Sequence, residues 1–351
     1  MNNVPEKRLR AAGDWHPMVI HAAGMCCAVG YHLAAASCAL RAGVDHFRES
    51  SFIDHSGKSL LAAQLDFEDL WGPQRLAQIV KMAVADCAGA GNAIDPASTV
   101  LILTAAERGR PHTEVDNFEQ LYRECQALFD APFHEGSAVF PHGRAGIGDA
   151  LWHAQSQLQL DSVERVLLVG ADSLLDAATI EHYLGQDRLL CTGNASGFIP
   201  GEGAAALLLG IAGPSDTGLH IIGAGRALES AKPDGEIPNR AIGLTAAMRE
   251  ALALADLPAN ALDFRANDQN GETFFAKEAA NAYARLMGDD GTGLPIVQVA
   301  DCIGETGGAA GPMTLAFLST LMSRDDAPGE RALLHFASDE GQRAALIVEY
   351  R

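Results

Sequence analysis

Ionisable and amide side chains gather in four short polar segments of this chain. Carboxylates can act as general bases or bind magnesium and calcium, and guanidinium groups can neutralise them. Brought together, such residues would form a site for acid–base chemistry or a network of ion pairs. The candidate residues are His142, Arg144, Asp268, Asn270, Glu272, Glu305, Asp339 and Arg343.

Two ordered segments in the middle of the chain indicate which elements position these residues. The run VLLVGADS at 166–173 has the pattern of a buried strand, and GFIPGEG at 197–203 precedes the apolar run 204–209. This pair, at this spacing, resembles the centre of a β-ketoacyl synthase (ketosynthase), a member of the thiolase superfamily. The resemblance implies an α/β, thiolase-like fold of five layers (αβαβα), built from two halves related by a pseudo-dyad.

The same resemblance assigns the positions at which a ketosynthase carries a nucleophilic cysteine, two histidines and a lysine. Counting back from the buried strand places the nucleophile position at Arg144 or Ala145. Asp268 takes the first histidine position to within one residue, Glu305 the second, and Ala300 the lysine position. The cysteine, both histidines and the lysine are thus replaced. Condensation of malonyl thioesters is not expected, because carboxylates would repel a malonyl carboxylate and destabilise an enolate.

In a thiolase-like fold the polar residues would converge on one cavity, and two interpretations remain open. One is a rebuilt active site with a carboxylate as general base. The other is a buried ion-pair network in which Arg144 neutralises Glu305 or Asp268. A magnesium or calcium site formed by Asp268, Glu272 and Glu305 is conceivable. No spacing singles it out, so no metal or other cofactor is predicted, and His142 is interpreted as a turn histidine at a helix start.

Three functions compete. The first is a ketosynthase homologue without condensing activity that acts as a partner or scaffold subunit, much as chain-length factors pair with active ketosynthases. The second is an adaptor or accessory protein, because the Asn270-Gly271-Glu272 turn also resembles thiolase-like proteins found beside type VI secretion cargo genes. The third is an acyltransferase or hydrolase that uses the carboxylate and arginine site. An open acyl tunnel would favour the first and third, and a filled tunnel the second.

The composition and net charge of the chain limit the classes of partner that it could bind. The 351 residues are 48% hydrophobic and 20% charged, with a net charge of −20, which is typical of a globular protein that repels nucleic acid. The same charge argues against docking an acidic acyl carrier protein. We nevertheless consider four partners: an acyl carrier protein, a ketosynthase, a secretion cargo protein, and a second copy of the chain in a homodimer. No apolar run could cross a membrane, the start lacks a secretory pattern, and the seven cysteines suggest reduced thiols in a cytoplasmic protein.

Strands alternate with helices on both sides of a glycine- and proline-containing break at 210–218, which predicts two α/β halves at 1–210 and 219–351. The resemblance to ketosynthases implies a homodimer in which the strand near Leu101 pairs across the dimer axis, and the apolar run of that strand would otherwise be an exposed edge. A turn is predicted at 24–30. Predicted strands are 18–23, 99–104, 166–169, 204–209, 219–223, 295–299, 332–336 and 344–350. Predicted helices are 31–41, 73–90, 144–158, 242–254, 276–286 and 308–322.

Overall fold

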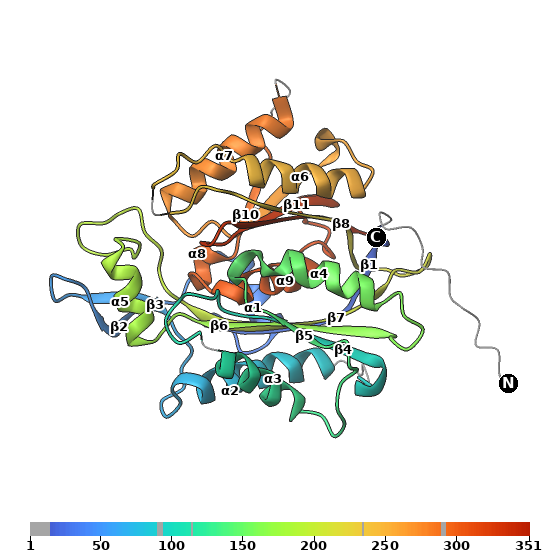
Figure 1. The fold of residues 1–351 in the computed structure, drawn as a ribbon, viewed down its shortest axis with the longest axis horizontal. Helices are drawn as coiled ribbons and strands as arrows, with labels where there is room; N and C mark the ends of the chain where they lie inside the picture. Colours follow the sequence, from blue (N-terminus) through green and yellow to red (C-terminus); the bar gives the residue numbers. More distant parts are fainter. Residues whose placement is uncertain (1–14, 90–93, 114, 234, 289–292) are drawn as a thin grey trace.

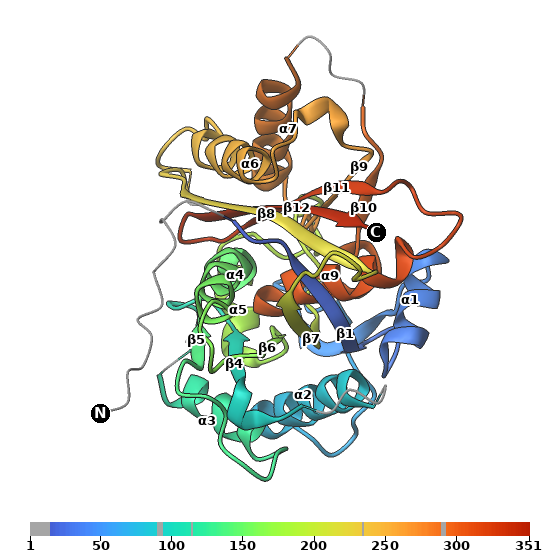
Figure 2. The same ribbon diagram turned by 90° about the vertical axis from the view of Figure 1, so that its right-hand side faces the viewer.

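The computed structural model describes residues 15–89, 94–113, 115–233, 235–288 and 293–351, and these form five alternating layers of helix and sheet (Figure 1). Two layers of strands enclose central helices, and further helices cover each outer face (Figures 1 and 2). The predicted thiolase-like αβαβα arrangement is confirmed. The outer helices are α6 (Ile242–Leu254) and α7 (Thr273–Met287) on one face, and α2 (Gly72–Ala88) and α3 (Val115–Gln126) on the other. The central helices are α1 (Leu33–Arg41), α4 (Gly146–Gln157), α8 (Ala300–Ile303) and α9 (Ala310–Leu321).

The strands of the first half lie in the order β1–β7–β6–β4–β5. Antiparallel pairs join β1 to β7 and β7 to β6, and parallel pairs join β6 to β4 and β4 to β5. Burial on both faces explains why these strands are runs of apolar residues with no alternation. Their bounds are β1 (Met18–Cys27), β4 (Thr99–Thr104), β5 (Ala138–Phe140), β6 (Arg165–Ser173) and β7 (Glu202–Ile211).

The second half repeats this strand order and direction as β8–β12–β11–β9–β10. The repetition gives the two pseudo-dyad-related halves that were predicted. Met18 and Val19 also pair with β8, so the strands form one ten-stranded sheet that passes from one layer to the other. The bounds are β8 (Leu219–Leu228), β9 (Phe264–Asn267), β10 (Ile296–Gln298), β11 (Arg331–Ala337) and β12 (Gln342–Tyr350).

Two local predictions are wrong. The strand that contains Leu101 is β4, and it lies between β6 and β5 with every residue buried, so it is not an edge. The edge of this half is the short strand β5, which sequence patterning did not detect. The turn predicted at 24–30 begins late, because β1 continues to Cys27 and pairs with the start of β7.

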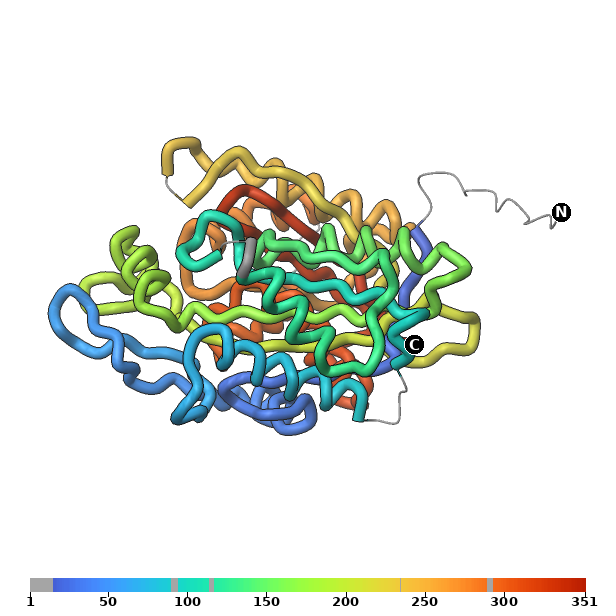
Figure 3. Tube along the Cα trace, turned by 60° about the horizontal axis from the view of Figure 1, so that its bottom comes forward, coloured from blue at the N-terminus to red at the C-terminus, as the bar shows by residue number. Residues whose placement is uncertain are grey.

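A hairpin and a helix that were not predicted project together from one end of the molecule (Figure 3). The hairpin consists of β2 (Phe47–Ile53) and β3 (Ser59–Ala63), and the helix is α5 (Ala177–Gly185). Leu60 of the hairpin packs in one apolar cluster with Ile180 of α5 and Phe198 of the GFIPGEG segment. This cluster attaches the projection to the segment that borders the candidate site.

Small residues let the two central helices approach each other closely. An added Cβ at Gly311 of α9 would lie 2.7 Å from the Ile147 side chain of α4. An added Cβ at Gly148 of α4 would lie 2.8 Å from Ala344 of β12, so α4 also packs closely on the sheet. The first nine residues of α9 are all buried, as expected for a helix that is apolar on every face. This packing brings the starts of α4 and α9 together, where the candidate site lies.

No helix in the described part of the chain is long and apolar enough to span a lipid bilayer. All seven cysteines are unpaired, and five of them are buried. Burial raises the pKa of the Cys27, Cys87 and Cys125 thiols to about 12. These thiols therefore stay protonated and act as packing groups.

A buried ion pair between Arg75 of α2 and Glu202 of the GFIPGEG segment gives the first testable prediction. The guanidinium donates to the carboxylate over 2.5–3.0 Å, and the two side chains are 4% and 0% exposed. Arg75→Met should lower the free energy of unfolding by about 3 kcal/mol, because it leaves a buried carboxylate unpaired. Arg75→Met/Glu202→Gln should recover part of that loss in urea denaturation.

The matched control is Arg48→Met, which removes a pair whose side chains are 60% and 75% exposed and should change stability by about 0.5 kcal/mol or less. Equal effects of Arg75→Met and Arg48→Met would contradict the assigned role of the buried pair.

Candidate functional site

The candidate site lies where the carboxyl ends of parallel strands meet the starts of buried helices. Asp268 directly follows β9, and Asp339 follows β11, its parallel neighbour. Arg144 lies in a single 3₁₀ turn, 143–145, that leads into α4, and Glu305 lies just before the 3₁₀ turn that leads into α9. Since carboxyl ends of parallel strands share one edge, segments far apart in sequence contribute side chains to one place.

Arg144 is the centre of the cluster. Its side chain is 6% exposed and lies 3.1 Å from the Glu305 carboxylate, 3.6 Å from Asp268 and 3.5 Å from Asp339. The guanidinium also stacks on the Phe275 ring, with 4.3 Å between its carbon and the ring centroid. The predicted contact between Arg144 and Glu305 or Asp268 is present with both partners. The positions matched to the nucleophile and to the two histidines thus lie together.

A second guanidinium, Arg188, was not predicted. Arg188 follows α5 and donates to Glu272 over 2.7 and 3.0 Å and to Asp339 over 2.6 and 3.0 Å. Asp339 therefore bridges Arg188 and Arg144. No motif in the sequence marks Arg188, because its partners come from segments more than eighty residues away.

The GFIPGEG segment fixes Glu305 through its backbone. The Glu305 amide donates to the Ile199 carbonyl over 2.8 Å, and the Gly201 amide donates to the Glu305 carbonyl over 2.9 Å. A Cβ at Gly201 would lie 2.3 Å from the Ile303 carbonyl oxygen, so glycine is required for this approach. The Glu305 carboxylate also accepts from Asn270 over 2.5 Å and from the Gly307 amide over 2.7 Å. The most recognisable motif of the sequence thus positions a central carboxylate.

Asp268 and Ser338 link the cluster to the second half of the sheet. The Asp268 carboxylate accepts from the Ala337 amide over 2.8 Å, at the end of β11. The Ser338 hydroxyl accepts from the Ala145 amide over 2.9 Å and donates to the His142 carbonyl over 2.5 Å. The backbone at the position matched to the nucleophile, Arg144 or Ala145, is thereby bonded to the turn after β11.

Three of the predicted positions take no direct part in the cluster. His142 points to Asp149, with 2.9 Å between Nδ1 and the carboxylate, and that pair is partly exposed. Arg343 forms a separate, fully buried pair with Glu278 over 2.7 and 3.0 Å. Ala300, at the start of α8, has no polar side chain. The structure brings together Arg144, Asp268, Asn270, Glu272, Glu305 and Asp339, with Arg188 and Glu107 added.

Negative charge exceeds positive charge in this network. Arg144 and Arg188 face the carboxyl groups of Asp268, Glu272, Glu305 and Asp339, and Glu107 accepts from the Asp339 and Glu340 amides over 3.0 and 2.5 Å. Burial, followed by the charge of Asp339, raises the pKa of Glu107 to about 7. Burial raises the pKa of Asp268 to about 6, against the opposing effect of Arg144. Burial opposes ionisation of Asp339 too, but Arg188 and Arg144 outweigh it and lower the pKa.

Little space remains among the side chains of the cluster. The cavity bordered by Arg144, Arg188, Glu305 and Asp339 has a volume of about 20 Å³, enough for about one water molecule. A wider polar hollow of about 460 Å³ lies beside it, bordered by Arg188, Asp339 and Lys232. Within the described ranges, no three or more His, Cys, Asp or Glu side chains are arranged to hold a metal ion.

Removal of the central cation gives the second prediction. Arg144→Ala should lower the free energy of unfolding at pH 8 by about 3 kcal/mol, because ionised carboxylates then face each other without a counter-charge. The loss should shrink towards pH 5, where Asp268 and Glu107 are protonated. Thermal melts of both proteins at several pH values measure this difference. Arg226→Ala removes a half-exposed guanidinium from Asp149 and is the control, with little effect expected at any pH.

A difference between wild type and Arg144→Ala that stays constant from pH 5 to pH 8 would contradict the role of Arg144 as the counter-charge of the cluster.

The raised pKa of Glu107 gives the third prediction. A carboxyl group with a higher pKa in the folded state loses stability as pH rises from its unfolded value, about 4.3, to its folded value of about 7. Glu107→Gln cannot ionise, and its single carboxamide oxygen accepts from one of the two amides while its NH2 group faces the other. Because the loss of that bond does not depend on pH, the stability of the variant relative to wild type should rise by up to about 2 kcal/mol between pH 5 and pH 8. The exposed Glu124→Gln variant is the control, and a Glu107→Gln protein that follows the wild-type pH profile would contradict the assignment.

Solved structures provide the comparison with known proteins, since no family model and no curated protein matches this sequence. A chain of a type II polyketide synthase acyl-carrier protein in complex with its hexaketide-bound ketosynthase is 12% identical, with a TM-score of 0.81 over 96% of this chain and 100% of that chain. A β-ketoacyl synthase from Burkholderia phymatum STM815 is 18% identical, with a TM-score of 0.73 over 96% and 100%. A chain of the ketosynthase ApeO in complex with its chain length factor ApeC, from Xenorhabdus doucetiae, is 14% identical, with a TM-score of 0.69 over 96% and 98%. The chain therefore has the thiolase-like ketosynthase fold.

Proposed function

We propose that this protein is a ketosynthase homologue that does not condense malonyl thioesters and that acts as a partner or scaffold subunit. The observation that carries the proposal is the position of Arg144, which is buried among three carboxylates where a ketosynthase of this fold needs room for an acyl thioester. The remaining cavity of about 20 Å³ cannot accept a thioester. The replacement of the cysteine, both histidines and the lysine, which the sequence resemblance implies, supports the same proposal.

The charge distribution in the site also opposes condensation. A ketosynthase stabilises the enolate that forms when malonate loses carbon dioxide, and positive or neutral donors do this work. Here carboxylates outnumber guanidinium groups, and both guanidinium groups are already bonded to carboxylates. A malonyl carboxylate would meet net negative charge, and the guanidinium groups of Arg144 and Arg188 already face carboxylates of the protein.

For the partner we propose a second copy of the chain or a ketosynthase. The similar solved structures include a ketosynthase bound to its chain length factor and a ketosynthase bound to its acyl carrier protein. Strand β5 ends the first half of the sheet, so a partner could extend the sheet there by pairing with it. The net charge of −20 makes an acidic acyl carrier protein the less favoured partner.

An adaptor for type VI secretion cargo is the second candidate, and the filled site favours it as well, because an adaptor needs no substrate cavity. The third candidate, an acyltransferase or hydrolase, rests on the polar hollow of about 460 Å³ beside Arg188 and Asp339. Glu340, at 52% exposure and paired with Lys232, borders that hollow too, and the carboxylate of the polar network that a substrate would reach there is Asp339, at 23% exposure. Its bonds to Arg188 weaken it as a general base, since they lower its pKa.

An activity assay with malonyl and acetyl thioesters tests the loss of condensation. Purified protein should release neither carbon dioxide nor free thiol above the rate without protein, while an active ketosynthase assayed in parallel does both. Turnover that disappears in Arg144→Ala or Glu305→Gln would overturn the proposal. Thioester hydrolysis without condensation, lost in Asp339→Asn, would select the rebuilt hydrolase.

Sedimentation analysis tests the partner. The protein alone, and the protein mixed with the ketosynthases of its own organism, should form a dimer at micromolar concentration, either of two copies or of one copy and one ketosynthase. A monomer under both conditions would contradict the proposed subunit role and favour the adaptor.

A further inference from the structure

The outer layer formed by α6 and α7 presents positive charge on a strongly acidic chain (Figure 2). The charged residues of these two helices are Arg249, Glu250, Lys277, Glu278 and Arg285. The three basic side chains are exposed, and none of them forms an ion pair in the described part of the chain. Glu278 is buried against Arg343, and the Glu250 carboxylate accepts from the Arg226 amide over 2.8 Å. The layer therefore offers three cations to solvent, although the net charge of the chain is −20.

The two most exposed large apolar side chains among the described residues lie at the edge of this layer. Leu228, the last residue of β8, is 74% exposed, and Ile242, the first residue of α6, is 64% exposed. They lie close together, because a Cβ added at Gly243 would be only 2.6 Å from the Leu228 carbonyl oxygen. Single exposed apolar residues are ordinary, but neighbouring ones are typical of a surface that another molecule covers.

Basic side chains border this apolar pair. Arg240 is exposed, and its carbonyl accepts from the Arg285 guanidinium, so the end of α7 lies beside the start of α6. Arg249 lies two turns after Ile242 on the same face of α6. Glu236 is the one exposed carboxylate among the described residues of the loop 229–241. The α6–α7 face is defined here by Leu228, Arg240, Ile242, Arg249 and Arg285.

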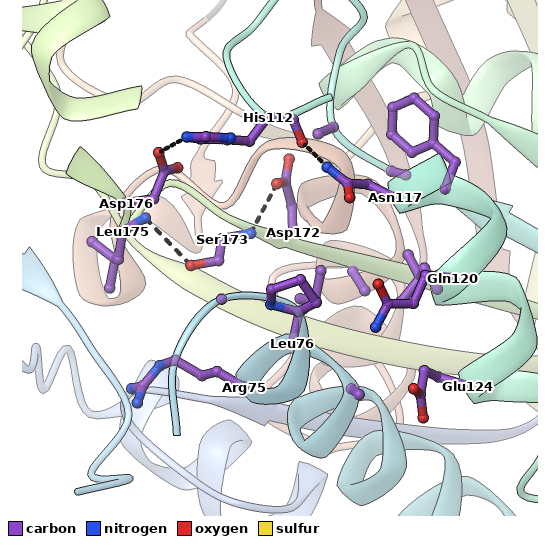
Figure 4. Close-up of a pocket in the computed structure, with 18 of the residues that line it drawn as sticks. Arg75, Leu76, His112, Asn117, Gln120, Glu124, Asp172, Ser173, Leu175 and Asp176 are labelled. Atoms are coloured by element: carbon purple, nitrogen blue, oxygen red, sulfur yellow. Dashed lines mark hydrogen bonds and ion pairs between the residues drawn. The ribbon is translucent and has the colours of Figure 1, made fainter. Parts of the chain in front are cut away.

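The corresponding outer layer of the first half, α2 and α3, has no such excess of positive charge. The exposed charges among the side chains described there are Lys81, Glu119, Arg123 and Glu124, which balance each other. A cavity of about 370 Å³ borders these helices, and Figure 4 shows the carboxylates of Glu124, Asp172 and Asp176 around it. The two halves share a strand order but not a surface, so the fold alone does not account for the cations of the α6–α7 face.

The charge of the whole chain limits what can cover the α6–α7 face. Duplex nucleic acid or an anionic membrane would extend beyond the face and meet the acidic remainder of the surface, which repels it. A second copy that used the same face would place like charges opposite each other across a symmetric interface. A short acidic segment fits within the face, where its carboxylates meet the arginines and its apolar side chains cover Leu228 and Ile242.

We infer that the α6–α7 face is the docking surface for a partner protein that presents a short acidic segment with interspersed apolar side chains. The inference deepens the proposed scaffold function and rests on it, since a scaffold holds more than one partner. The edge strand β5 of the first half serves one partner, and the α6–α7 face on the outer layer of the second half serves another.

Fluorescence anisotropy with a short labelled peptide of repeated Glu-Leu-Leu-Glu units tests the inference. The matched peptides are Lys-Leu-Leu-Lys, which reverses the charge, and Glu-Ala-Ala-Glu, which removes the large apolar side chains. The acidic apolar peptide should bind one molecule per chain, about tenfold more tightly than either matched peptide, and more weakly as salt is added. Phosphatidylserine vesicles or duplex DNA that bind more tightly than this peptide would overturn the assignment of an acidic protein segment.

Surface variants locate the binding site. Arg249→Glu and Ile242→Ser should each weaken binding of the acidic apolar peptide about tenfold. The controls are Arg48→Glu and Ile53→Ser, at exposed positions of the β2–β3 hairpin, which should leave binding unchanged. All four substitutions are at exposed side chains, and each variant is checked for a wild-type melting profile.

The outcomes separate this inference from the proposed function. Absence of saturable binding to wild type, equal affinities for the three peptides, or unchanged binding to both Arg249→Glu and Ile242→Ser would overturn the inference. A protein that sediments as a dimer or with a ketosynthase but does not bind the acidic apolar peptide would fail this inference alone. A chain that remains a monomer under every condition would fail the proposed subunit role instead.

Discussion

The arrangement of this site depends on the requirement that buried carboxylates have a counter-charge. Removing an ionised carboxylate from water costs several kcal/mol, about as much as a small protein gains from its whole fold. Arg144 lies within 3.6 Å of three carboxylates, and two of them come from the second half of the sheet and one from the segment before α9. The guanidinium therefore joins the two halves of the molecule at the point where their central helices begin.

The same requirement explains why each of the surrounding buried arginines is paired with a carboxylate. Arg188 pairs with Glu272 and Asp339, Arg343 with Glu278, and Arg110 with Asp172. The centroid of the Phe275 ring lies within 6.0 Å of the guanidinium carbons of Arg144, Arg188 and Arg343. The flat face of the ring can stabilise these cations without hydrogen bonds. A catalytic site leaves donors or bases free for a substrate, whereas here the donors of Arg144 and Arg188 are directed at the protein itself. This difference is the physical basis for the proposal that the site has a structural role.

Sequence patterning predicted the fold through its apolar runs and its glycine motif. Strand β4 was predicted to the residue, and the strand order repeated in the two halves agrees with the predicted pseudo-dyad. Patterning missed β5 because three residues carry no periodicity, and the edge of the sheet was therefore assigned to the wrong strand. The pairing of Arg144 with Glu305 could be predicted, because the resemblance matched both positions to one cavity. The participation of Arg188 and Glu107 could not be predicted, because only the folded chain brings them to Asp339. His142, which was a candidate for the cluster, faces Asp149 instead.

The coupling energy between Arg144 and Glu305 tests the central claim most directly. It is obtained from the free energies of unfolding of the wild type, Arg144→Met, Glu305→Gln and the double variant at pH 8. If the network is structural, the two residues should be coupled by about 2 kcal/mol or more, and the double variant should be more stable than Arg144→Met. A coupling near zero, with each single variant as stable as the wild type, would contradict the account, because the charges would then contribute nothing to the fold.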